Sequence, residues 1–548
     1  MNFMKLFMHS KGIIYKYATL VLILLLSTNI CYSQNWKNGG WYADNGNGTY
    51  TNPILHSDYS DPDVCKAGDD FYMTASSFNC VPGLPVLNST DLVNWEIIGY
   101  ALPELYDTVF NRPQHGNGVW APAIRYHNNE FYIYWGDPDF GIYMVKANAA
   151  KGPWSKPHLV HAAKGWIDPC PFWDEDGKAY LVHAFAGSRA GIKNILVMHE
   201  MSPDGYTINP NPVLVFDGHN NHPTIEGPKL YKRNGYYYIF APAGGVKPGW
   251  QTVLRSKTIF GPYEDKIMLH QGNTNINGPH QGGYVELESG ESWFIHFQDK
   301  DAYGRIVHLQ PVNWENNWPM IGADINHDGI GEPVRTYKKP ILNSPSGKKF
   351  IPTSDEFNST QFGLQWQWHA NPKPEWSFTS PYGSLRINCV MIPADHKSLW
   401  DVPNLLLQKL PSEEFTATAK FRFYPKQEGD QTGLVMMGED YAYLACEFSE
   451  GKNWITYNTC HDARTVGNEL EQKKIEIQSD EIFLRVEVKQ GAVCRFSYSI
   501  DGQKFLTIEE PFTARAGRWI GAKVGIFALK TTSTNDSGYA DFDWFRFE

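Results

Sequence analysis

The stretch Tyr59-Ser60-Asp61-Pro62-Asp63, followed by the aromatic segment Phe71-Tyr72-Met73, decides the fold, because its pattern recurs along the chain. Five short aromatic segments are spaced roughly 48 to 60 residues apart, which is typical of propeller blades. The segments are Phe71-Tyr72-Met73, Phe131-Tyr132-Ile133, Ala179-Tyr180-Leu181, Tyr237-Tyr238-Ile239 and Trp293-Phe294-Ile295. Turn-forming pairs such as Asn234-Gly235 directly precede them and indicate hairpins. The repeat predicts an all-β, five-bladed propeller.

Three of the repeats carry a carboxylate at a similar place. Asp61, Asp168 and Glu226 each lie about 11 or 12 residues before the central tyrosine of their segment. The first strand of each blade lines the propeller axis, so equivalent positions converge there. A proline closely follows each acid and restricts the backbone. A single Asp-Pro pair is an ordinary turn starter, but the matching positions predict three acids around one pocket.

In the two remaining repeats, we place Trp120 and Gly282 at the equivalent position, with His280 close to the latter. The predicted pocket has acids on three sides, an aromatic wall on the fourth and a histidine on the last. Hydrolysis of a glycosidic bond requires one protonated and one ionised carboxyl group. A third carboxylate can tune and orient the acid. The constellation therefore predicts a small, sugar-sized hydrolytic site.

Composition agrees with a soluble protein of two domains. The chain has 548 residues, of which 42% are hydrophobic and 20% charged. A net charge of −11 argues against a nucleic acid as the partner. The aromatic content of 14% is typical of all-β chains that bind sugars, although aromatic side chains also fill β cores.

The N-terminus predicts export. Lys5, Lys11 and Lys16 precede an apolar run at 18–26, and cleavage before Gln34 would remove a signal peptide of residues 1–33. The run is short for a transmembrane helix, and no other segment predicts a membrane span. A lipid anchor at Cys31 is the alternative, but Ile30 is the wrong size for a lipid-attachment motif. We expect a periplasmic location.

The predicted propeller covers residues 34–337, and a polar connector covers 338–350. Residues 351–548 contain long alternating segments that predict a β-sandwich or jelly roll. Near its start stand three tryptophans that favour core or interface packing over a sugar platform; they are Trp366, Trp368 and Trp376. The seven cysteines after the leader have no metal-binding spacing, which favours small buried residues and leaves a disulfide open.

Several motifs occur in one order that resembles glycoside hydrolase family 43. They are Asn52-Pro53-Ile54-Leu55, Ser60-Asp61-Pro62-Asp63, Gly68-Asp69-Asp70-Phe71-Tyr72, Ser89-Thr90-Asp91-Leu92-Val93-Asn94-Trp95, Trp120-Ala121-Pro122, Asp168-Pro169 and Glu226-Gly227-Pro228. The resemblance covers the whole predicted propeller. The C-terminal part resembles the accessory domain of β-xylosidase and α-L-arabinofuranosidase members.

The resemblance implies an inverting mechanism that needs no cofactor. Asp61 matches the general base, Glu226 the general acid, and Asp168 the carboxylate that tunes the acid and orients the substrate. Arg305 matches an arginine that hydrogen-bonds sugar hydroxyls. His280 matches a central histidine that often lies beside a water-bound cation in relatives, and a structural hydrogen bond is favoured for it over a direct metal bond.

Two further segments suggest local features. Cys80 and Val81 stand where some xylosidase relatives have bulky aromatics, so a wider site and removal of a branch sugar are expected. The loop Asp324-Ile325-Asn326-His327-Asp328-Gly329 begins like a calcium-binding loop. Arg335 stands where a bidentate Glu is needed, so a polar turn is favoured, with a structural calcium left open.

We therefore expect an exo-acting inverting glycosidase that releases terminal α-L-arabinofuranosyl residues from plant hemicellulose oligosaccharides. A main activity as a β-xylosidase is the first alternative. An endo-arabinanase is disfavoured, because the extra domain can close a groove into a pocket. A non-catalytic sugar-binding propeller would have lost at least one acid, whereas all three are present.

Overall fold

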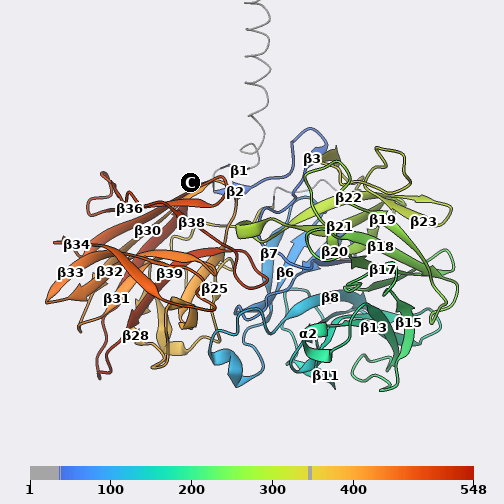
Figure 1. The fold of residues 1–548 in the computed structure, drawn as a ribbon, viewed down its shortest axis with the longest axis horizontal. Coiled ribbons are helices and arrows are strands. Elements are labelled where there is room, and N and C mark those ends of the chain that lie inside the picture. The colour runs from blue at the N-terminus through green and yellow to red at the C-terminus, as the bar shows by residue number, and fades with distance from the viewer. Residues whose placement is uncertain (1–35, 38, 343–348) are drawn as a thin grey trace, which may run out of the picture.

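The computed structural model describes residues 36, 37, 39–342 and 349–548, and the expected signal peptide lies outside them (Figure 1). Two β domains lie side by side, with the propeller coloured blue to yellow and the second domain orange to red. Within the described ranges, no helix has the length and apolar character needed to cross a membrane.

The propeller consists of five antiparallel four-stranded sheets, each with its strands in chain order. Blade one contains β4 (Asp63–Ala67), β5 (Asp70–Thr74), β6 (Gly83–Ser89) and β7 (Glu96–Leu102). Blade two contains β8 (Trp120–His127), β9 (Glu130–Asp137), β10 (Gly141–Ala147) and β11 (His158–Ala162). Blade three contains β12 (Trp166–Trp173), β13 (Ala179–Phe185), β14 (Ile195–Met201) and β15 (Val213–Asp217). Blade four contains β16 (Lys229–Arg233), β17 (Tyr236–Ala243), β18 (Trp250–Ser256) and β19 (Glu264–Leu269). Blade five contains β20 (His280–Glu286), β21 (Ser292–Asp299), β22 (Arg305–Glu315) and β23 (Trp318–Ile321).

The five aromatic segments all lie in the second strand of a blade, which confirms the predicted propeller. Tight hairpins connect the first two strands. Asn128 and Asn129 have φ of 49° and 64°, and Asn234 and Gly235 have φ of 50° and 74°. Two consecutive left-handed residues match the twist of the flanking strands, which explains the choice of Asn and Gly.

Additional short elements complete the propeller. β3 (Thr49–Thr51) pairs with β24 (Thr336–Lys338), so the two ends of the propeller segment meet. The short elements are β1 (Trp36–Lys37), β2 (Gly40–Trp41), η1 (Thr108–Asn111), α2 (Gly187–Ala190) and η2 (Asp301–Tyr303). Asn52 joins the same closure, because its side chain donates to the carbonyl of Leu309 at 2.8 Å and accepts from its amide at 2.9 Å.

The C-terminal domain is a sandwich of two eight-stranded sheets, as predicted. One sheet has the order β25 (Gln367–Trp368), β29 (Leu405–Lys409), β39 (Lys523–Lys530), β31 (Gln431–Met437), β32 (Tyr441–Ser449), β33 (Lys452–Cys460) and β34 (Glu469–Ile477), with β28 (Val390–Met391) also on β39. The other has the order β26 (Ser377–Ser380), β27 (Ser384–Asn388), β40 (Tyr539–Phe547), β30 (Phe415–Tyr424), β35 (Glu481–Lys489), β36 (Val493–Ser499) and β37 (Leu506–Thr507), with β38 (Phe512–Thr513) on β36. Two short turns are η3 (Pro374–Trp376) and η4 (Leu399–Asp401).

A continuous hydrophobic core joins the two domains. Trp366, Trp368 and Trp376 are buried in it, which confirms packing rather than a sugar platform. The backbone of Trp368 exchanges two hydrogen bonds with that of Val81 in the propeller, at 2.5 Å and 3.0 Å. Burial of such side chains stabilises the contact by about 1.5–3 kcal/mol each. All seven cysteines after the leader are buried free thiols, as favoured by their spacing.

Candidate active site

Every blade carries a left-handed residue just before or at the start of its first strand. These residues are Asp61 (φ 53°), Ala121 (39°), Asp168 (57°), Gly227 (58°) and Gln281 (36°). The next residue is proline in four blades and glycine in the fifth. In β8, β12 and β20 the pairing register shifts at this point. Such a bulge changes the direction of the side chains and directs consecutive residues toward the axis.

This backbone feature corrects the alignment of the repeats. Asp61 and Asp168 occupy the left-handed position, whereas Glu226 lies one residue before it, as do Trp120 and His280. The structural equivalents of Asp61 in blades two and five are therefore Ala121 and Gln281. The assignment of Trp120 and Gly282 to that position was wrong by one residue, because the proline and not the acid marks the register.

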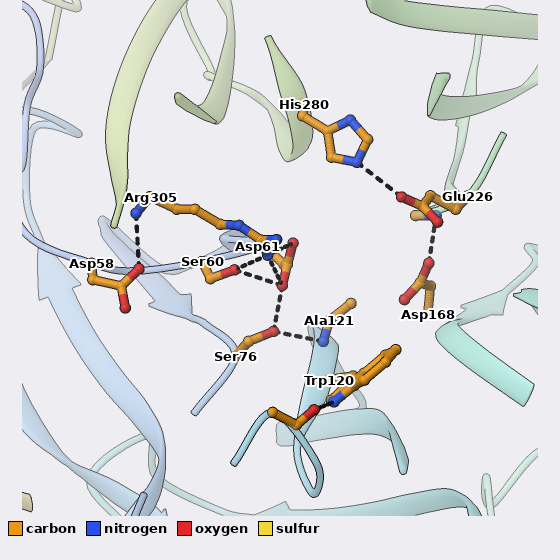
Figure 2. A network of polar contacts seen from close by, with 12 residues as sticks. Asp58, Ser60, Asp61, Ser76, Trp120, Ala121, Asp168, Glu226, His280 and Arg305 are labelled. Carbon is orange, nitrogen blue, oxygen red and sulfur yellow. Dashed lines mark hydrogen bonds and ion pairs between the residues drawn. The ribbon is translucent and has the colours of Figure 1, made fainter. Parts of the chain in front are cut away.

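The site is a cavity of about 210 Å³ at one end of the propeller axis. Six residues singled out from the sequence line it: Asp61, Trp120, Asp168, Glu226, His280 and Arg305. Asp61 and Asp168 are only 6% and 3% exposed, whereas the side chain of Glu226 is 31% exposed. Figure 2 shows Asp61 on one side, and Asp168 and Glu226 together on the other.

Three side chains hold the carboxylate of Asp61. The hydroxyls of Ser60 and Ser76 donate to its Oδ2 at 2.8 Å and 2.6 Å, and Nη1 of Arg305 lies 3.4 Å from its Oδ1 (Figure 2). The Ser76 hydroxyl also accepts a bond from the amide of Ala121 at 2.7 Å. Donors on both oxygens fix the direction of the carboxylate.

Arg305 is itself fixed by a buried acid. Its amide donates to Oδ1 of Asp58 at 2.9 Å, and its Nη1 donates to the Ser60 hydroxyl at 2.6 Å. The second oxygen of Asp58 accepts a bond from the amide of Gly521, in the sandwich, at 2.9 Å. One carboxylate therefore connects a pocket residue of the propeller to a loop of the other domain.

The opposite side of the pocket is less well supplied with donors. Oδ2 of Asp168 accepts a bond from the amide of Gly227 at 2.7 Å. Burial raises the pKa of Asp168 well above its ordinary value of 3.8, and the negative charge of Glu226 raises it further. Oε1 of Glu226 lies 3.1 Å from Nε2 of His280 (Figure 2). The charge of Glu226 thus favours the protonated form of the buried Asp168 carboxyl.

The second domain contributes a residue to the pocket wall that the sequence did not single out. Trp519 of the sandwich lines the cavity, with its ring centre 6.5 Å from that of Trp120 at an interplanar angle of 72°. The indole of Trp120 is anchored by a bond to the carbonyl of Gly116 at 2.8 Å. Trp519 lies outside the repeats, and nothing in its local sequence separates it from a surface aromatic.

Comparisons with known proteins agree with this geometry. Residues 50–319 match the model for glycosyl hydrolases family 43, and residues 354–548 match that for a β-xylosidase C-terminal concanavalin A-like domain. A Xylanibacter ruminicola protein named "Putative beta-xylosidase" is 40% identical over 496 residues, which cover 89% of this chain and 87% of the relative. This chain belongs to glycoside hydrolase family 43.

Other relatives share the full architecture. The Bacteroides ovatus protein named non-reducing end alpha-L-arabinofuranosidase BoGH43B is 30% identical over 538 residues, covering 91% of this chain and 94% of the relative. The crystal structure of the family 43 protein BlXynB from Bacillus licheniformis superposes with a TM-score of 0.78 at 26% identity, covering 91% of this chain and 99% of that one.

The structure corrects the placement of Cys80 in this family 43 glycosidase. Cys80 is 2% exposed and lies outside the cavity, and its Sγ is 2.8 Å from Nζ of Lys523 in the sandwich. Its side chain is directed at the domain interface instead of the sugar site. The wider pocket expected from Cys80 therefore loses its physical basis.

The loop 324–329 folds as a polar turn. The carboxylate of Asp324 accepts bonds from the amides of Asp328 and Gly329, both at 3.1 Å, and Asp328 accepts one from Ile330 at 2.8 Å. No group of three or more His, Cys, Asp or Glu among the described residues is arranged to hold a metal ion. The donors around His280 likewise form no direct metal cage in this part of the chain, and its Nε2 contacts Glu226.

Proposed function

We propose that this glycosidase is exo-acting and inverting, and that it removes one terminal pentose from a plant hemicellulose oligosaccharide. The observation that carries the proposal is the small cavity of about 210 Å³, which Trp519 of the second domain borders. Pockets for larger ligands typically span about 300–1,000 Å³, so a single sugar ring fits this space better than a bound chain.

In the proposed mechanism, Asp61 accepts a proton from a water molecule, which attacks the anomeric carbon. Glu226 donates its proton to the glycosidic oxygen, and the leaving sugar departs with that proton. Asp168 supports this step, because its proximity favours a protonated carboxyl in the pair. Arg305 and His280 are placed to bind sugar hydroxyls, and Trp120 and Trp519 to pack against the ring. Attack opposite the leaving group inverts the anomeric configuration.

For the sugar released, β-D-xylose is the first candidate. The relative at 40% identity carries the name of a β-xylosidase, and Cys80 no longer supports a preference for arabinose. α-L-Arabinofuranose is the second candidate, supported by the name of the B. ovatus relative.

The deciding experiment compares kcat/KM on nitrophenyl β-D-xyloside and α-L-arabinofuranoside. The larger value identifies the sugar, and activity on neither would favour a non-catalytic propeller. Proton NMR of the first-formed sugar tests the stereochemistry. A product with retained configuration would exclude Asp61 as the base that activates water.

We also propose that the chain is exported after cleavage before Gln34 and is located in the periplasm. The charged and apolar pattern of residues 1–33 supports this proposal. N-terminal sequencing of the mature protein and cell fractionation test it. A lipid-modified Cys31 would replace it with a membrane-anchored form.

A further inference from the structure

Two basic residues, one from each domain, flank the mouth of the pocket. Lys193 of the propeller lines the cavity, and Arg518 of the sandwich directly precedes Trp519. The guanidinium of Arg518 lies 4.3 Å from the ring centre of Trp519. This positive mouth contrasts with the chain as a whole, which carries a net charge of −11.

Neighbouring basic residues are neutralised by carboxylates. Arg189 pairs with Asp139 at 3.3 Å, and Arg464 pairs with Glu439 at 3.2 Å. Across the described ranges, no carboxylate lies within ion-pair distance of Lys193 or Arg518. Burial lowers the pKa of Arg518, and the charges of Arg464 and Arg189 lower it further, whereas the charge of Glu439 raises it. In the described ranges, Lys193 and Arg518 thus carry their charges without a direct ion pair, although Glu439 acts on Arg518 from beyond that distance.

The position of Lys193 relates it to the leaving group. Its neighbour Asn194 accepts a bond from the amide of Thr224 at 2.6 Å, two residues before Glu226. The proposed acid Glu226 protonates the oxygen of the leaving sugar, so that sugar emerges on the Lys193 side. The aliphatic part of Lys193 also packs beside Gly187, another residue of the cavity wall.

Arg518 packs next to the two tryptophans of the pocket wall. Its Cβ and Cγ pack closely against Gly116, whose carbonyl anchors Trp120. Trp120 also lies beneath the guanidinium of Arg189, at 5.7 Å from its ring centre. The two tryptophans therefore meet edge to face, and Arg518 covers the ring of Trp519.

Neutralising the catalytic acids is the alternative role for these cations, but other residues fill it. Arg305 forms the ion pair with Asp61, and the charge of the buried Lys229 acts on Asp168. Lys193 and Arg518 are thus available to a ligand at the mouth.

We propose that Lys193 and Arg518 form a leaving-group subsite for an anionic sugar, one that carries a uronic acid carboxylate or a sulfate ester beside the scissile bond. The inference rests on the proposed function, because the acid role of Glu226 defines the leaving-group side. The planar guanidinium donates two parallel bonds to such an anion, and the ammonium adds a point charge. Both contacts are absent with a neutral branch.

Matched oligosaccharides test the proposal. The probes share one terminal pentose and one backbone, and differ only in the sugar next to the scissile bond, which carries a uronate, its methyl ester, a sulfate ester or no substituent. Calorimetric binding to the Asp61→Ala variant gives Kd with negligible turnover, and kcat/KM of the wild-type chain is measured in parallel. We expect uronate or sulfate to bind about tenfold more tightly than the neutral methyl ester, with the preference declining as salt rises. The Kd values of the uronate and sulfate probes, compared with each other, identify which anion the subsite prefers.

Charge-removing variants locate the effect. Lys193→Gln and Arg518→Gln should each lower the anionic-to-neutral preference roughly threefold, and the double variant about tenfold. Lys193→Arg retains the charge and should retain the preference. Lys178→Gln is the control, because this substitution also removes one positive charge. Lys178 comes after the end of β12, whereas Asp168 lies near the start of that strand.

The outcomes separate the two proposals. Equal Kd for the uronate and its methyl ester, or a preference unchanged in the double variant, would overturn the anionic subsite. Binding preference without any hydrolysis would retain the subsite and reject the proposed function. Hydrolysis of the neutral probes with no preference for an anionic probe would retain the proposed function and reject the subsite.

Discussion

Asp61 and Asp168 occupy the same left-handed backbone position in two blades, yet their carboxylates have opposite surroundings. Asp61 receives hydrogen bonds from two hydroxyls and lies beside a guanidinium. Asp168 receives an amide bond and faces another carboxylate, and its pKa is raised, chiefly by burial. The same backbone conformation thus presents one acid to hydrogen-bond donors and the other to a second carboxylate.

Position in the repeat does not determine the surroundings of an acid. The donors around Asp61 come from Ser60, Ser76 and Arg305, none of which has a counterpart around Asp168. The Asp168 side instead contains Glu226, which stands one residue before the left-handed Gly227. Function follows from what each blade adds beside the shared turn.

Replacing Asp61 should have the largest effect. Asp61→Ala is expected to lower kcat/KM by about 10⁴-fold with all substrates, because no other group activates the water. Azide should partly restore turnover, since the vacated space can admit a small anionic nucleophile. The product should then be a glycosyl azide of inverted configuration by NMR. Near-normal turnover without azide would remove Asp61 from the mechanism.

Replacing Glu226 should separate the two sides of the pocket. Glu226→Gln is expected to lower kcat/KM by about 10³-fold on an oligosaccharide, which needs a proton on its leaving oxygen. With a dinitrophenyl glycoside the loss should be far smaller, because this leaving group departs without protonation. The Asp61→Ala variant is the control and should fail on both substrates. Equal losses for Glu226→Gln on both would contradict its role as the acid.

Much of this architecture could be predicted from the sequence, because hairpins and aromatic strands are local features. The five repeats and the convergence of Asp61, Asp168 and Glu226 follow from periodicity alone. The one-residue error at Trp120 and Gly282 arose from aligning acids instead of the prolines. The series Pro62, Pro122, Pro169 and Pro228, with Gly282 in the fifth blade, carried the correct register.

Features that depend on the second domain could not be predicted in this way. Trp519 and Gly521 reach the pocket or its supports only after the sandwich has packed on the propeller. Cys80 was placed in the wall from its neighbours in the sequence, but the direction of its side chain depends on Lys523, which is 443 residues away. Tertiary contacts of this range leave no periodic trace.

Replacing Asp168 tests the raised pKa directly. Asp168→Asn should lower kcat/KM by about 10²-fold, since the acid loses its partner. The same substitution should lower activity but increase the free energy of unfolding relative to wild type at neutral pH. The folded state of the wild type binds this proton more tightly than the unfolded state, so its contribution to stability is lost as pH rises from about 4 through the raised pKa. The amide has no such loss.

Urea unfolding at several pH values measures this difference. The stability of Asp168→Asn relative to wild type should increase from pH 4 to pH 7. Asp501→Asn, an exposed turn carboxylate with a lowered pKa, should show the reverse trend. A relative stability of Asp168→Asn that falls or stays constant with pH would contradict a raised pKa for Asp168.

The smallest effect tests how the sandwich supports the Asp61 side. Asp58 accepts bonds from the amides of Arg305 and Gly521, so Asp58→Asn places an NH₂ group against one of two buried donors. We expect a loss of about 2 kcal/mol in unfolding free energy and about a tenfold rise in KM, with a smaller change in kcat. In the proposed mechanism Arg305 binds sugar in both the ground and transition states, so its displacement is expected to affect mainly KM. Asp501→Asn is the matched control, because it also accepts two amide bonds, at 2.8 Å and 2.9 Å, but in an exposed turn. If Asp58→Asn lowered stability but left KM unchanged, Asp58 would join the domains without positioning Arg305. The positions of Arg305 and Asp61 would then depend on the propeller alone.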